Sequence, residues 1–187
     1  DGKCTLKGQT KDDAAGEAFD KAAKMLDIGY PGGVVIDKMA KNGYCRKYDF
    51  PRAMKDFNDF SFSGLKTSLL NMLKKRPEPF TPEELIDVVA SYQEAIIDVL
   101  VEKTLRVARQ EGMSRVAVCG GVAANSRLRV RFNEDAKKQN IEVFIPPPVL
   151  CTDNAGMIAV AGYALLKKDV RSDLDLNAVS RWPSMIS

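Results

Sequence analysis

The sequence predicts an α/β protein with parallel strands. Predicted strands and helices alternate through the second half of the chain, and neither an internal repeat nor a low-complexity linker interrupts its 187 residues. That length is enough for one domain with a real core, or for two small ones. Hydrophobic residues make up 45% and charged residues 28%, the usual balance of a globular protein.

The first half of the chain is predicted to be mostly helical. Residues 4–10 alternate as a short strand does, and a second strand is expected at residues 60–63, after an irregular aromatic-rich segment. Glycines and a proline within residues 29–33 break the helical pattern. Three helices are expected, over residues 12–26, 34–42 and 65–75.

The second half begins with the longest predicted helix. Thr81 is a preferred cap, Pro82 suits the first turn, and Glu84 stands where a capping box places its acid. Apolar side chains at helical spacing continue toward Gly112, where the helix is expected to end. The elements beyond it alternate: a strand at 116–119, a helix at 124–139, a strand at 141–148 and a helix at 152–168.

Composition limits the possible functions. The net charge of +3 is compatible with an anionic partner but does not require one. Because the chain has no histidine and only four scattered cysteines, a metal site within it would depend on carboxylates and thiols. No apolar run reaches the length of a membrane span and the first residues lack a signal-peptide pattern, so we expect a cytoplasmic protein without membrane contact.

Two strand-to-helix corners are the first candidate sites. At Gly120–Gly121 the bare backbone would let a phosphate or ribose approach the start of a helix, and Asn125 offers an amide that donates and accepts. The alternative is a tight corner without a ligand. At the second corner Thr152 or Asp153 could simply cap a helix, but a carboxylate at the end of a strand is also a common metal ligand or catalytic group. The two corners could share a cleft.

A third candidate lies near the N-terminus. Asp20 could hold a ribose hydroxyl if its helix points at the cleft, with close backbone approach at Gly33 and Asp37 one turn later. The alternative is a solvated helix face with a Glu17–Lys21 ion pair. Two basic groups, residues 74–76 and the arginines at 127, 129 and 131, are explained by solvated helix faces, and any polyanion contact there would be modest.

Four segments, in their order and spacing, resemble the TsaD/Gcp family of tRNA adenosine threonylcarbamoyltransferases, formerly described as O-sialoglycoprotein endopeptidases. They are DDAAGEAFDKAAKMLDIGYPGG, FSFSGLKTSL, CGGVAANSRLR and CTDNAGMIAVAGY. The resemblance covers essentially the whole chain. It implies a two-lobed actin-like, sugar-kinase and Hsp70-like fold (the ASKHA, RNase H-like class), of which residues 1–187 would be the C-terminal lobe with a helical insertion.

The resemblance also implies an activity and a set of site residues. The family transfers the threonylcarbamoyl group from threonylcarbamoyl-AMP to N6 of the adenosine beside the tRNA anticodon, which forms t6A and releases AMP. Asp20, Gly33, Asp37 and Asn125 would bind the adenylate. Asp153 would ligate a divalent metal, iron or zinc, that polarises the transferred carbonyl.

The sequence departs from the family pattern in one respect. The family's metal site also uses two histidines from an H-x-x-x-H helix, and this chain has none. We therefore expect the N-terminal lobe to be absent, the metal not to be held, and the chain alone to be inactive. An unpaired edge at residues 4–10 would then invite self-association.

Two other functions remain open, and partners follow from the family. A kinase or ATPase lobe of the same superfamily would use the same glycine corners for phosphates, and a non-catalytic interaction lobe would perform no chemistry. No Ser/His, Cys/His or H-E-x-x-H arrangement supports a protease. By resemblance the partners are tRNA, a smaller paralogous subunit and a P-loop ATPase subunit.

Overall fold

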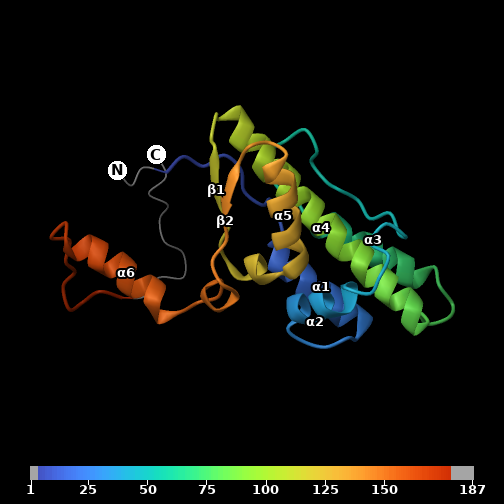
Figure 1. Ribbon diagram of the computed structural model, residues 1–187. Coiled ribbons are helices and arrows are strands. Elements are labelled where there is room, and N and C mark those ends of the chain that lie inside the picture. The colour runs from blue at the N-terminus through green and yellow to red at the C-terminus, as the bar shows by residue number, and fades with distance from the viewer. Residues whose placement is uncertain (1–3, 178–187) are drawn as a thin grey trace.

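The computed structural model describes residues 4–177, and one long helix, α4, runs through the centre of the fold (Figure 1). Helices α1, α2 and α3 pack around its first half, and α5 with a small sheet packs against its second half. The helices are α1 (Ala15–Leu26), α2 (Gly32–Ala40), α3 (Ser63–Lys74), α4 (Pro82–Gln110), α5 (Ser126–Lys137) and α6 (Ala155–Leu166). The strands are β1 (Arg115–Ala117) and β2 (Glu142–Phe144), and the 3₁₀ turns are η1 (Gly121–Ala124) and η2 (Pro148–Leu150).

Helix α4 starts as its sequence predicts. The Thr81 hydroxyl accepts the N–H of Glu84 at 3.2 Å, and the Glu84 carboxylate accepts the N–H of Thr81 at 2.9 Å. This reciprocal pair satisfies two donors that a helix start would otherwise leave unpaired. The capping box and the proline in the first turn are therefore confirmed.

Two hydrophobic clusters share α4. The larger one joins α1, α2 and α3 to the first half of α4, and its Phe50 and Tyr92 rings meet edge to face with centroids 5.2 Å apart. The smaller one lies between the second half of α4, α5 and the sheet, and includes Leu105 and Phe132. Because the same helix contributes to both clusters, it fixes α5 relative to α1 and α2.

The sheet has two parallel strands, which confirms the predicted α/β class. Arg115 pairs with Glu142, and the register continues to Ala117 opposite Phe144. The middle residue of each strand packs against the smaller cluster, while its neighbours are exposed. One face of this sheet is therefore open, which is unusual for parallel strands.

Two of the predicted strands do not form. In residues 4–10 and 60–63 the pairing is a single parallel bridge between Thr10 and Phe60, in which the Lys11 N–H donates to the Phe60 carbonyl at 2.9 Å. Residues 4–9 offer little for a sheet to bury, since Leu6 is 48% exposed and the nearby polar residues face solvent. The strand edge expected there therefore does not form, and self-association itself stays a prediction.

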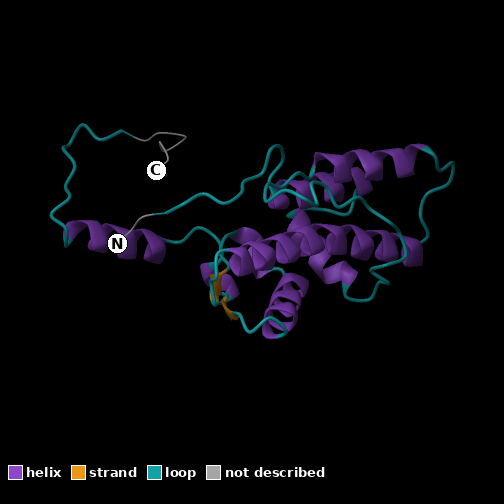
Figure 2. Cartoon of the chain, turned by 90° about the horizontal axis from the view of Figure 1, so that it is seen from above, coloured by secondary structure: helices purple, strands orange, loops and turns teal. Residues whose placement is uncertain are grey.

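Helix α6 stands apart from the rest of the described fold (Figures 1 and 2). All of its residues are exposed, although its sequence is almost entirely apolar. It is the right element at the predicted place, but nothing within residues 4–177 covers it. In that same range, no helix combines the length and the apolar character needed to cross a membrane.

Candidate functional site

A cavity of about 770 Å³ opens where α1, α2 and the turn before α5 meet. Its walls include all four residues that the sequence identified as candidate substrate ligands: Asp20, Gly33, Asp37 and Asn125. These residues come from three segments far apart in the chain, so it is the fold that brings them together. Small-molecule sites typically enclose roughly 300–1,000 Å³.

Asp20 ties α1 to the start of α2. Its Oδ1 accepts the N–H of Gly32 at 2.8 Å, and its Oδ2 makes no hydrogen bond within residues 4–177. A Cβ on Gly32 would lie 2.6 Å from the Phe19 carbonyl oxygen, so only glycine allows this approach. The glycines that were expected to end a helix therefore begin α2 instead, and Gly33 borders the cavity with open space around it.

Asp37 joins α2 to the start of α5. Its carboxylate accepts the Ser126 hydroxyl at 2.8 Å and the Ser126 N–H at 3.1 Å. Ser126 is the first residue of α5, so this carboxylate pairs a donor that the helix start leaves free. In this structure Asp37 holds the cavity wall together, and its contact with a ligand stays a prediction.

Asn125 is the N-cap of α5, and both ends of its amide are engaged. Oδ1 accepts the N–H of Leu128 at 2.9 Å, and Nδ2 donates to Oε1 of Gln93 at 2.7 Å. Asn125 and Gln93 are both buried. One N–H of the Asn125 amide is left, and the residue lines the cavity. Sequence reasoning missed Gln93, although a glutamine among the apolar positions of a buried helix was a signal for it.

The glycine corner bends as its sequence indicated. Gly120 has a φ of +91°, a backbone region that L side chains rarely adopt. The N–H groups of Gly121 and Val122, which begin the 3₁₀ turn, have no acceptor among the described residues. Both residues line the cavity. The corner therefore borders a hollow and leaves two backbone donors without a protein partner.

The second corner contributes less. Thr152 lines the cavity, whereas Asp153 is exposed and is not part of its wall. Within residues 4–177, no three His, Cys, Asp or Glu side chains are grouped so as to hold a metal ion. One exposed carboxylate without imidazole partners does not fit a transition metal by itself. These residues alone are thus not a metal centre.

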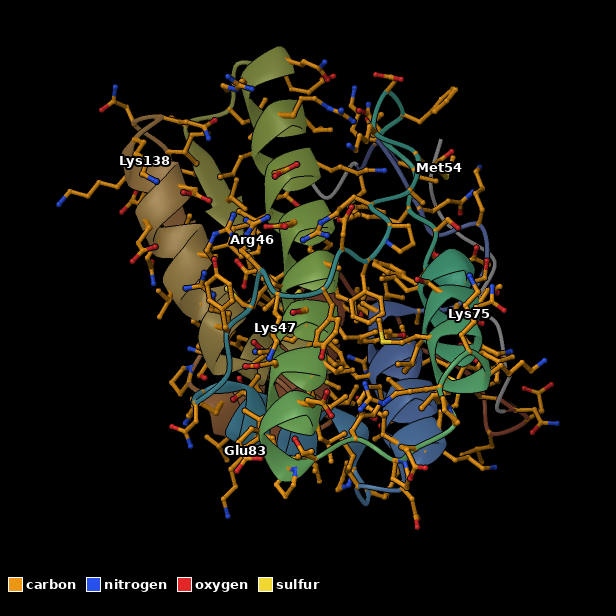
Figure 3. All side chains as sticks on the ribbon, turned by 90° about the vertical axis from the view of Figure 1, so that its right-hand side faces the viewer. Arg46, Lys47, Met54, Lys75, Glu83 and Lys138 are labelled. Atoms are coloured by element: carbon orange, nitrogen blue, oxygen red, sulfur yellow. The ribbon has the colours of Figure 1, made fainter. Side chains whose placement is uncertain are left out.

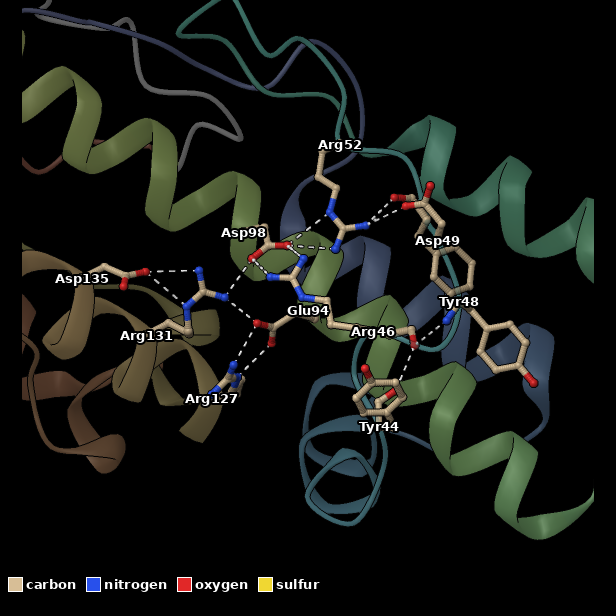
Figure 4. Close-up of polar contacts among 12 residues, drawn as sticks. Tyr44, Arg46, Tyr48, Asp49, Arg52, Glu94, Asp98, Arg127, Arg131 and Asp135 are labelled. Carbon is tan, nitrogen blue, oxygen red and sulfur yellow. Dashed lines mark hydrogen bonds and ion pairs between the residues drawn. The ribbon is translucent and has the colours of Figure 1, made fainter.

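Behind the cavity, α5 is fixed to α4 by a buried charge network (Figure 4). Glu94 pairs with Arg127 at 2.8 Å and with Arg131, and Arg131 also pairs with Asp98 at 2.8 Å. Burial raises the pKa of Glu94, but the hydrogen bond and the charge of Arg127, together with the Arg131 charge, outweigh it and lower the pKa. Asp98 follows the same pattern with Arg131 and Arg52. Both acids are therefore ionised.

This network corrects the interpretation of the basic residues on α5. Arg127 and Arg131 are not on a solvated face but bind the acids of α4, and Arg129 donates to the Pro146 carbonyl. In the other basic group, Arg76 pairs with Glu84 at 2.6 Å. Lys75, the residue that follows α3, lies on the opposite side of α4 from α5 (Figure 3). The two groups therefore do not form one continuous basic surface.

These observations define an α/β protein with a cavity of about 770 Å³ beside the glycine corner that precedes α5. Comparison with protein families matches residues 1–160 to the one described as "TsaD: tRNA N6-adenosine threonylcarbamoyltransferase". Since the match covers well over half of the chain, the chain belongs to this family. The resemblance found from the motifs is thereby confirmed.

Curated relatives agree with the family assignment. A protein of Syntrophus aciditrophicus (strain SB), named tRNA N6-adenosine threonylcarbamoyltransferase, is 64% identical over 97% of this chain and 54% of its own length. A protein of the same name from Thermotoga neapolitana is 54% identical over 91% of this chain and 52% of its own length. The chain therefore spans about half the length of the curated relatives it matches.

Two solved structures share the fold. Full-length HypF in the phosphate- and nucleotide-bound form aligns with a TM-score of 0.58 and 16% identity, over 80% of this chain and 20% of HypF. HypF of T. kodakarensis aligns with a TM-score of 0.54 and 21% identity, over 79% of this chain and 20% of HypF. At these identities the likeness concerns the fold alone.

Proposed function

We propose that the whole protein is a tRNA-modifying transferase that carries a threonylcarbamoyl group from threonylcarbamoyl-AMP to N6 of the adenosine beside the anticodon. The observation that carries the proposal is the shared cavity: residues from three distant segments line one hollow of nucleotide size in a chain of the TsaD family. The names of the relatives support the same reaction.

No residue of this chain needs to form a covalent bond with the substrate in this reaction. The N6 nitrogen attacks the carbonyl carbon of the carbamoyl group, the new C–N bond replaces the C–O bond to the phosphate, N6 loses a proton, and AMP leaves. The contribution of these residues is to bind and orient the adenylate, so that the carbonyl carbon and N6 meet in a reactive geometry.

The cavity supplies groups suited to a nucleoside monophosphate. The free Oδ2 of Asp20 would accept a ribose hydroxyl, and the remaining N–H of Asn125 would donate to the ligand. Gly33 leaves room for the backbone to approach, and the unpaired N–H groups at Gly121 and Val122 suit an oxygen-rich ligand. Asp37 would contact the adenylate from the cavity wall, where its carboxylate also accepts the Ser126 hydroxyl.

The metal proposed for the family would lie at the edge of this chain. Asp153 would be its one ligand here, and the remaining ligands for iron or zinc would have to come from the half of the protein outside this chain. Because the donor set within residues 4–177 does not fit a metal, no step of the reaction is assigned to it.

We further propose that this chain is the C-terminal lobe of a two-lobed protein of the ASKHA class. The open face of the β1–β2 sheet and the exposed apolar surface of α6 support this organisation, since both are surfaces that a second lobe would cover. The relatives are about twice as long as the part they share with this chain. The chain alone would then be inactive.

The family relationship also supports a set of partners and a location. We propose that the whole protein acts in the cytoplasm on tRNA, together with a smaller paralogous subunit and a P-loop ATPase subunit. No residue of this chain is assigned to those subunit contacts.

A transfer assay tests the proposed function. The whole protein is given threonylcarbamoyl-AMP and tRNA with its partner subunits, and t6A is measured by mass spectrometry of nucleosides. We expect t6A with the wild-type protein, at least a tenfold lower rate with Asp20→Ala, and none with residues 1–187 alone. Phosphoryl transfer from ATP without t6A would instead identify the kinase alternative.

A further inference from the structure

Gln93 on α4 lies behind Asn125, on the side of Asn125 away from the cavity. Its Oε1 accepts the Asn125 Nδ2–H at 2.7 Å, and both side chains are buried, with 4% and 7% of their surface exposed. This is the only hydrogen bond that the Gln93 side chain makes within residues 4–177. A buried amide is costly unless it is paired, and the partner of the Gln93 oxygen in the described fold is Asn125.

The two partners of Asn125 leave its amide a single orientation. Its Oδ1 must face the Leu128 N–H, and its Nδ2 must face the Gln93 oxygen. A flipped Asn125 amide would set two donors against each other at Leu128, so the Leu128 N–H selects the orientation and the Gln93 oxygen holds the Nδ2 end in place. The direction of the remaining Asn125 N–H is therefore fixed before any ligand arrives.

The next residue on α4 holds Gln93 in register with Asn125. Glu94 pairs with Arg127, two residues after Asn125 (Figure 4). The Gln93–Asn125 amide pair and this ion pair therefore hold the first turn of α5 at adjacent positions. The Glu94 side chain is 1% exposed, which limits any shift between the two helices.

We propose that Gln93 is a positioning residue of the nucleoside site: it fixes the amide of Asn125 so that its free N–H points to one acceptor on the bound nucleoside. Gln93 itself lies outside the cavity wall and acts through Asn125. The inference rests on the proposed function, because it takes Asn125 as a ligand-binding group.

Calorimetric titration of the whole protein with adenosine tests the proposal. Gln93→Leu removes the acceptor at similar size, and we expect the Kd for adenosine to rise about tenfold, the effect of one misplaced hydrogen bond. Gln93→Glu keeps an acceptor for the Asn125 N–H, so its Kd should stay within about threefold of wild type.

A double-mutant cycle separates positioning from general destabilisation. If Gln93 acts only through Asn125, Gln93→Leu should raise the Kd in the wild-type background and change nothing further in Asn125→Ala. Ser91→Ala is the matched control: Ser91 is buried on the same helix, but its hydroxyl contacts the Tyr44 carbonyl and the Tyr48 N–H. It should lower the melting temperature and leave the Kd unchanged.

Failure of the nucleoside site and failure of the positioning role give different results. If wild-type protein does not bind adenosine, the nucleoside site itself fails. If it binds and a folded Gln93→Leu binds equally well, or if the effects of Gln93→Leu and Asn125→Ala simply add, the positioning role is overturned. Should Gln93→Leu not fold, Gln93→Glu decides: near wild-type affinity supports the role, and a tenfold loss with normal melting contradicts it.

Discussion

The two strand-to-helix corners have the same local design and different surroundings. In each, an asparagine caps the helix: Asn125 accepts the Leu128 N–H at 2.9 Å, and Asn154 accepts the Met157 N–H at 3.0 Å. At the first corner the other end of the amide reaches Gln93 on another helix, whereas at the second it returns to the Thr152 carbonyl.

The helices that follow these corners differ in the same way. α5 buries Leu128, Phe132 and Ala136 against the core, and α6 buries no side chain within the described residues. A helix cap therefore depends on residues close in sequence. A binding site at that cap also needs a second helix or strand packed against the capped helix. The corner at Asn125 has that element in α4, and the corner at Asp153 would need it from another part of the protein.

The largest expected effect is the loss of the charge network behind the first corner. Glu94→Gln would leave the Arg131 guanidinium buried with an incomplete set of partners. We expect a loss of about 3 kcal/mol in the free energy of unfolding, within the usual cost of breaking a buried ion pair. Urea unfolding of the whole protein measures it, and a loss below about 1 kcal/mol would show that the network does not hold α5.

The next prediction compares the two caps directly. Asn125→Ala removes a cap and also leaves Gln93 unpaired, so we expect a loss of about 2 kcal/mol, against about 1 kcal/mol or less for Asn154→Ala. Thermal unfolding of both variants checks the order. Equal losses would mean that the buried contact with Gln93 adds nothing to the local cap.

A third prediction concerns a cap supplied from outside its helix. Asp12 accepts the N–H groups of Phe62 and Ser63 at the start of α3. Burial raises the pKa of Asp12, but hydrogen bonds from the Ser61 hydroxyl, these two N–H groups and the Ser63 hydroxyl lower it from 3.8 to about 2. Because the folded pKa is lower, the stabilisation is present above about pH 4 and is lost as the pH falls toward 2.

Asp12→Asn tests this dependence. The variant should be less stable than wild type at pH 7, by about 1 kcal/mol as for other helix caps, and the difference should shrink steadily below pH 4. Melting curves between pH 2 and pH 7 provide the measurement. A difference that stays constant down to pH 2 would contradict the assigned hydrogen bonds.

The smallest effect is expected near α6. Asp169 and Arg171 form an ion pair at 3.1 Å with side chains 85% and 73% exposed. Asp169→Asn should change the free energy of unfolding by less than about 0.5 kcal/mol, as is usual for surface pairs. A change comparable to that of Glu94→Gln in the same urea experiment would show that the region after α6 is packed.

Much of the fold could be predicted from local signals. The capping box at Thr81, the glycine corner at Gly120 and the periodicity of the helices each depend on residues close in sequence, and the structure confirms them. The prediction of a strand at residues 4–10 was wrong. Alternating residues form a strand only where a neighbouring sheet pairs with them, and no sheet lies beside this segment in the described fold.

The candidate site was predicted in part. The motifs identified Asp20, Gly33, Asp37 and Asn125, and the structure places all four around one cavity. Gln93 and the pairing of Arg127 with Glu94 were missed, because residues more than thirty positions apart meet only once α5 packs on α4. Spacing within one helix carries no information about that contact.

A titration with AMP decides whether the corner at Asn125 is a nucleotide site. AMP is titrated into the whole protein, and into its Asn125→Ala and Asn154→Ala variants, by calorimetry. We expect Asn125→Ala to weaken AMP binding at least tenfold and Asn154→Ala to leave it unchanged. Equal affinity in all three proteins would contradict it.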